Sequence, residues 1–131
     1  MTNQSRSGGW HARQYIAAAL FALTMLVSAG PVLPHAVVVD STPRDQAELT
    51  SAPRAVELRF NVRIEQALAR ASLKTGSGTP VALKLPPASG QSERLAVPLP
   101  PLGPGAYELR YHVLAADGHT TQGVLRFRIR P

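Results

Sequence analysis

Strict alternation of apolar and polar residues is the feature that most constrains what this sequence can fold into. It runs through three segments, 55–63, 107–114 and 123–130. A period of two places one set of side chains on a buried face of a strand and the other set in water. The pattern therefore predicts three amphipathic β-strands. Their inward side chains are predicted to be Val56, Leu58, Phe60, Val62, Tyr107, Leu109, Tyr111, Val113, Leu125, Phe127 and Ile129.

Weaker strand signals occupy four more segments, 35–40, 69–74, 80–85 and 94–98. The stretches between them are rich in proline, glycine and serine, which are typical of turns. Seven short strands with no convincing helix favour a small antiparallel sandwich or barrel. We therefore predict an all-β fold, and the length of 131 residues allows a single domain.

The first 34 residues have the features of a targeting segment. Arg6 and Arg13 precede an apolar run over 16–29, and no acidic residue accompanies them. As a helix, such a run would extend about 21 Å, which is shorter than the roughly 30 Å hydrocarbon core of a membrane. We therefore predict a signal peptide with a short post-cleavage segment over 1–34 and one exported domain over 35–131. A retained membrane anchor is the alternative.

Composition excludes several kinds of site. The chain has no cysteine, which rules out a disulfide scaffold, a thiolate zinc site, an iron–sulfur cluster and a thiol nucleophile. It also lacks the hydrolase, P-loop and dinucleotide-binding motifs. Both methionines precede the predicted domain, so the domain contains no sulfur. The formal net charge of +6 is compatible with an anionic partner but does not identify one.

Two groups of residues could bind a metal ion. Asp117 and His119 flank Gly118 between the last two strong strand segments. A carboxylate and an imidazole suit copper(II) or zinc, although an Asp-Gly hairpin turn with a merely exposed histidine is the alternative. His35 opens the predicted domain, where a histidine near a processed N-terminus can chelate through its ring and a main-chain nitrogen. A solvent-exposed histidine without such a role is again the alternative.

Arginine residues form a third feature. If they share one polar sheet face, they could contact phosphates or anionic lipid. Glu57 and Glu108 interleave with them, which favours a solvated face with cross-strand ion pairs. The arginines in question are Arg59, Arg63, Arg110, Arg126, Arg128 and Arg130.

Three motifs in order resemble the CopC-type periplasmic copper-binding family. They are H-A-V-V-V-D-S-T-P over 35–43, L-G-P-G-A-Y over 102–107 and A-D-G-H over 116–119. The resemblance implies a seven-stranded Greek-key sandwich or barrel of immunoglobulin-like kind with a copper(II) site at one end. By position, it implies His35, Asp117 and His119 as the metal ligands.

The resemblance also implies a function. Proteins of this family handle copper in the periplasm, by sequestration, transfer or resistance and without catalysis. A CopD-type inner-membrane protein is the implied partner, and neither nucleic acid binding nor a membrane-embedded mature form is expected. A copper-dependent oxidase with a histidine-brace-like site, and a metal-free β-sandwich that binds a protein, are the alternative functions.

Two features depart from the family pattern. The ligand histidine of the family is normally the first residue after cleavage, so that its α-amine completes the site. Here Val32, Leu33 and Pro34 precede His35, and the better cleavage signal follows Ala29. Cleavage there would leave two imidazoles and one carboxylate, with a weaker affinity.

The second departure is His112, where relatives carry a different polar residue. Because it alternates with inward residues, we expect it to be a surface histidine. A copper(I) site built from methionines is predicted to be absent, since the domain has no thioether.

Overall fold

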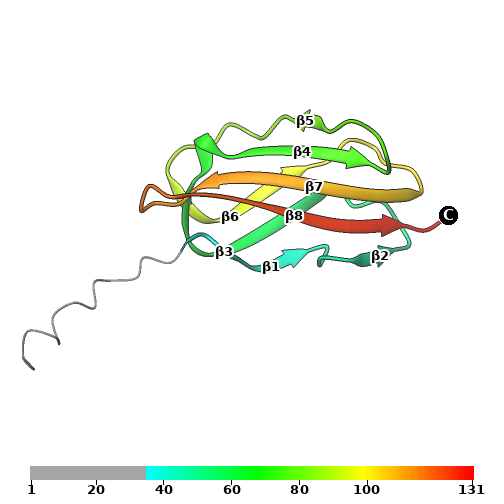
Figure 1. Ribbon diagram of the computed structural model, residues 1–131, viewed down its shortest axis with the longest axis horizontal. Helices are drawn as coiled ribbons and strands as arrows, with labels where there is room; N and C mark the ends of the chain where they lie inside the picture. The colour runs from blue at the N-terminus through cyan, green and yellow to red at the C-terminus, as the bar shows by residue number, and fades with distance from the viewer. Residues whose placement is uncertain (1–34) are drawn as a thin grey trace, which may run out of the picture. The chain divides into compact units, whose positions relative to one another are not determined.

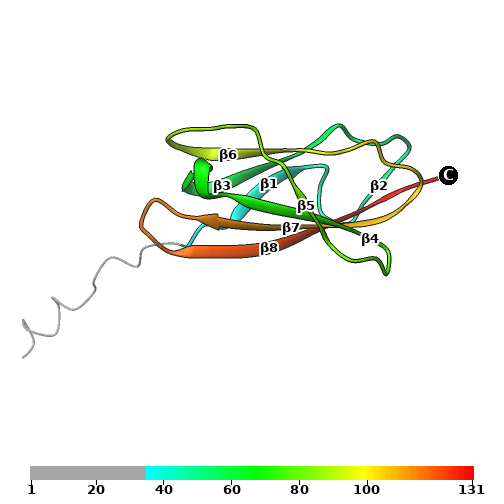
Figure 2. The same ribbon diagram turned by 90° about the horizontal axis from the view of Figure 1, so that it is seen from above.

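A computed structural model describes residues 35–131, so the predicted signal peptide and the residues preceding His35 lie outside the described residues. Two β-sheets pack face to face as two layers (Figures 1 and 2). The strands are β1 (Val38–Thr42), β2 (Ala47–Leu49), β3 (Ala55–Glu65), β4 (Arg70–Thr75), β5 (Val81–Leu83), β6 (Gln91–Pro98), β7 (Gly105–Leu114) and β8 (Thr120–Ile129). One sheet has the order β1-β3-β6 and the other β2-β8-β7-β4-β5. The predicted all-β sandwich is confirmed.

The strand count differs from the seven that the sequence predicts. β2 adds a short parallel partner to β8, with Ala47 opposite Phe127 and Leu49 opposite Ile129. A strand of three residues is too short to display a period, which is why the alternation did not reveal it. A single 3₁₀ turn, η1 (Gln66–Leu68), connects β3 to β4.

The alternating residues form the core as predicted. Leu58, Phe60, Leu109, Leu125 and Phe127 are all buried between the sheets, with the other inward apolar side chains around them. Two of the predicted inward residues, Val62 and Tyr111, are only half-buried. The pairing of β3 with β6 shifts after Arg59, and Ile64 is the next fully buried residue of that strand.

Tyr107 ties the proline-rich connector to the sandwich. Its hydroxyl donates a hydrogen bond to the carbonyl oxygen of Gly103, at 2.8 Å. Its ring stacks on Phe127, with 5.4 Å between ring centroids. A tyrosine whose hydroxyl returns to the backbone a few residues upstream is a recurring device of immunoglobulin-like sandwiches.

We expect Tyr107→Phe to lower the free energy of unfolding by about 1 kcal/mol, because a hydrogen bond is lost while the stacked ring remains. Tyr111→Phe is the matched control, since the Tyr111 hydroxyl forms no hydrogen bond with any of residues 35–131. Urea denaturation measures both changes. An equal loss in the two variants would contradict the role given to the Tyr107 hydroxyl.

The six arginines do not share one face, which corrects that hypothesis. Arg59 and Arg63 lie on β3 of the three-stranded sheet, and the other four lie on or next to β7 and β8. The expected ion pairs are present around Glu108. Its carboxylate lies 2.8 Å from Nε of Arg110 and 3.2 Å from Nε of Arg126. The hydrogen bond from Arg110 lowers the pKa of Glu108 below its usual value.

Candidate metal centre

The start of the described chain is held against β3. The backbone N–H of Val37 donates to Oδ1 of Asn61 at 2.7 Å, and the N–H of Asn61 donates to the carbonyl oxygen of Val37 at 3.0 Å. Ala36 is fully buried in the core. Since residues 36 and 37 are both fixed, the backbone position of His35 is restricted although its side chain is exposed.

The β7–β8 turn is held against the same strand. Ala116 donates a backbone hydrogen bond to the carbonyl oxygen of Arg63 at 2.9 Å, and Ala115 forms a bridge with Ile64. The turn closes through the N–H of Gly118, which donates to the carbonyl oxygen of Ala115 at 2.9 Å. Gly118 has φ +89°, a left-handed conformation that favours glycine. The Asp-Gly turn that the sequence indicated is therefore present.

These two attachments bring His35 and His119 together. The β7–β8 turn and the start of β1 lie at the same end of the sandwich (Figure 1). The two imidazole rings are 5.3 Å apart between centroids and nearly perpendicular, at 87°. Both side chains are exposed, so the pair is accessible to solvent.

Asp117 lies beside the pair, and its two carboxylate oxygens have different surroundings. Its Oδ1 accepts the backbone N–H of His119 at 2.9 Å, and this hydrogen bond is the main reason that the pKa of Asp117 is lowered. Its Oδ2 lies 3.2 Å from Nδ1 of His119. That oxygen is buried and has no well-aligned hydrogen-bond partner among residues 35–131. An ionised carboxylate whose second oxygen has no well-aligned hydrogen bond is a suitable ligand for a cation.

The donor set is two imidazoles and one carboxylate, which suits copper(II) or zinc. Within residues 35–131, no three acidic or histidine side chains already converge on one point as a complete metal cage. His35 and His119 contact each other edge to face, and Nδ1 of His119 is directed at Asp117. Ligation by all three therefore requires the exposed imidazoles to rotate about their side-chain bonds.

His112 is exposed, as expected, and stands apart from this cluster. It occupies β7 opposite Arg70 on one side and Gln122 on the other. The residues that sequence reasoning missed are the ones that position the site, above all Asn61 on β3. An outward amide on a strand carries no local signal of that role, because its partner at Val37 is distant in sequence.

The profile of the CopC domain family matches residues 38–130. The chain belongs to this family. Protein YobA of Escherichia coli (strain K12) is 32% identical over 115 residues, which span 86% of this chain and 92% of YobA. The copper transport protein CutJ of Bacillus subtilis (strain 168) is 31% identical over 100 residues, which are 72% of this chain but 18% of CutJ.

Solved structures agree with this assignment. CopC from Methylosinus trichosporium OB3b superposes with a TM-score of 0.65 at 29% identity, over 74% of this chain and 95% of that protein. PcoC, a methionine-rich copper resistance protein from Escherichia coli, has a TM-score of 0.62 at 23% identity, over 74% of this chain and all of PcoC, and supports the fold. No helix in residues 35–131 is long and apolar enough to cross a membrane.

Proposed function

We propose that this protein binds one copper(II) ion through His35, Asp117 and His119, and that it sequesters or transfers copper without catalysing a reaction. The observation that carries this proposal is the cluster at the end of the sandwich. Two exposed imidazoles lie in edge contact there, and beside them Oδ2 of Asp117 is buried and lies 3.2 Å from Nδ1 of His119. Copper(II) prefers a tetragonal set of nitrogen and oxygen donors of this kind.

The comparisons support copper as the cargo. A relative that is 31% identical over 100 aligned residues is named a copper transport protein, and a structural neighbour at 29% identity is named a CopC protein. The positive, then apolar, N-terminal segment supports export, and we place the mature protein in the periplasm.

We also propose that a CopD-type inner-membrane protein receives the copper. In CutJ, the region similar to this chain makes up 18% of a longer copper transport protein, so there the domain is joined to further chain. A domain that is fused to a transporter in one organism can act together with a separate transporter protein in another organism. Copurification of the copper-loaded protein with such a partner, compared with the metal-free protein, tests this step.

The oxidation state is tested by titration and reduction. We expect one equivalent of copper(II) to bind with the electron paramagnetic resonance spectrum of a tetragonal nitrogen and oxygen site. Because residues 35–131 contain no sulfur ligand, reduction with ascorbate in the presence of a copper(I) chelator should release the metal. Stoichiometric copper retained after reduction would contradict the assignment to copper(II), and ascorbate-driven oxygen consumption would favour an oxidase instead.

The position of the mature N-terminus determines whether the α-amine of His35 is available as a further ligand. Mass spectrometry of the exported protein distinguishes cleavage before His35 from cleavage after Ala29. Only the first product gives His35 a free α-amine, and we expect it to bind copper(II) more tightly than the second, since a nitrogen donor is added to the same two imidazoles and carboxylate.

A further inference from the structure

The outer face of the five-stranded sheet holds the excess positive charge of the domain. Residues 35–131 carry twelve basic and eight acidic side chains. Six of the basic and two of the acidic ones belong to this face, whereas the other six basic side chains are matched by six acidic ones. We call this surface the basic face, defined by Arg70, Lys74, Arg110, Arg126, Arg128 and Arg130 together with Glu48 and Glu108.

The two carboxylates of the basic face are already engaged. Glu108 contacts Arg110 and Arg126, and Glu48 contacts Arg130. No carboxylate within residues 35–131 lies within ion-pair distance of the three other cations, which are Arg70, Lys74 and Arg128. Among residues 35–131, the face therefore presents three cations that form no ion pair with a carboxylate.

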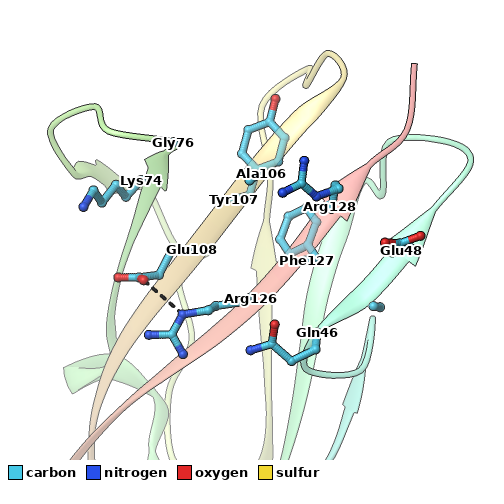
Figure 3. A pocket seen from close by; sticks show the side chains of 11 residues that line it. Gln46, Glu48, Lys74, Gly76, Ala106, Tyr107, Glu108, Arg126, Phe127 and Arg128 are labelled. Carbon is cyan, nitrogen blue, oxygen red and sulfur yellow. Dashed lines mark ion pairs between the residues drawn. The ribbon is translucent and has the colours of Figure 1, made fainter.

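A hollow opens on this face along β2, β8, β7 and the end of β4 (Figure 3). Its volume is about 320 Å³. Gly76 and Ala106, two small residues of its lining, are joined by a backbone hydrogen bond of 3.0 Å. The charged side chains of the lining are the cations of Lys74, Arg126 and Arg128 and the carboxylates of Glu48 and Glu108. The two carboxylates of the lining are paired with Arg126 and Arg130, so the unpaired cations Lys74 and Arg128 remain to attract a phosphate group.

We propose that the basic face docks the protein on a membrane surface rich in anionic phospholipid, with lipid phosphates in and around this hollow. Clustered basic residues are attracted to such surfaces over about a Debye length. A protein partner fits less well, because stable protein interfaces are built around buried aromatic or apolar anchors. The only exposed large apolar side chain that the structure describes on this face is Val124.

Docking in this way leaves the metal centre open. The hollow lies at the end of β7 that contains Ala106, and the turn that contains His119 follows the opposite end of this strand. The length of strand between the two ends is about 25 Å. The candidate copper site is therefore at an end of the sandwich and not beneath the docked face (Figure 1). The proposal does not depend on copper binding, and its test is separate from that of the proposed function.

The test measures binding of the exported protein to vesicles by cosedimentation. Vesicles of phosphatidylglycerol and phosphatidylcholine at 1:1 are compared with vesicles of phosphatidylcholine alone. We expect binding to the anionic vesicles only, and we expect it to disappear as sodium chloride is raised from about 0.05 to 0.5 M, where the Debye length falls several-fold. An apolar N-terminal segment that remained attached would bind both vesicle types, so the preference for anionic lipid is the readout.

Two triple variants that lose the same amount of charge distinguish an effect of the basic face from an effect of the protein's net charge. R70S/K74S/R128S removes the three cations of the basic face that have no carboxylate partner, and R54S/R59S/R94S removes three exposed arginines outside it. We expect the first to weaken binding at least about tenfold and the second less than about threefold.

Thermal unfolding checks that both variants are folded, and R128S alone replaces the first triple if that protein does not fold. Equal losses in the two triples would overturn the proposal, as would a wild-type protein that binds neutral and anionic vesicles alike or binds neither. In the last case, an acidic protein surface becomes the candidate partner of this face.

Discussion

His119→Ala should weaken copper(II) binding at least about tenfold, which corresponds to about 1.4 kcal/mol or more of binding free energy. The substitution removes one of the two imidazoles that the β7–β8 turn and the start of β1 bring into contact. It keeps Asp117 in place, because Oδ1 of Asp117 is held by the backbone N–H of residue 119 and not by its ring. Competition with a copper(II) chelator of known affinity measures the change.

His112→Ala is the matched control for this prediction. His112 is also an exposed histidine, but it lies within β7, on the outer face of the sheet beside Arg70 and Gln122. We expect its removal to change the copper(II) affinity by less than about twofold, as for a side chain outside the first coordination sphere. If the His112 variant lost more affinity than the His119 variant, the ligand assignment would be wrong.

Copper(II) affinity should fall steeply as the pH is lowered. Imidazole side chains ordinarily titrate near pH 6.5, and only the neutral ring binds a metal, so protons compete with copper for both histidines. With two imidazole ligands, the affinity should drop by up to about 100-fold per pH unit well below pH 6. The pKa of Asp117 is lowered by its hydrogen bond from His119, so this carboxylate stays ionised and adds to the loss only at lower pH.

A copper(II) titration from pH 8 to 5 measures this slope and also reports on the N-terminus. An α-amine titrates near about 7.7–8.0, so an amine ligand adds a further proton dependence already at neutral pH. The protein cleaved after Ala29 should therefore lack the loss between pH 8 and 7 that the protein beginning at His35 shows. An affinity that stays constant over the whole range would exclude histidine ligation.

The strands could be predicted where the side-chain pattern is long enough to show its period. β3, β7 and β8 each have eight or more residues, and their inward apolar side chains form the core. β2 has three residues and no detectable period. Its parallel pairing with β8 depends on where the β1–β2 connection places it, which is a property of the whole chain.

The allocation of strands to sheets could not be predicted from the same pattern. Arg59 and Arg126 both alternate with buried residues, so the sequence allowed them to share one polar face. In the fold, they lie on different sheets, so the positive charge is divided unequally between the two outer faces. Alternation defines which side of its own strand a residue occupies, but only backbone pairing defines which strands are neighbours.

By itself, the sequence determined the inward face of each long strand, the kinds of donor atom available and the Asp117–His119 turn, because these depend on residues close together along the chain. Only the tertiary structure decided that His35 meets this turn. The meeting depends on β3, which hydrogen bonds to Val37 through Asn61 and to Ala116 through Arg63. Such contacts join segments distant in sequence, and they form only once the packing of the two sheets has placed those segments side by side.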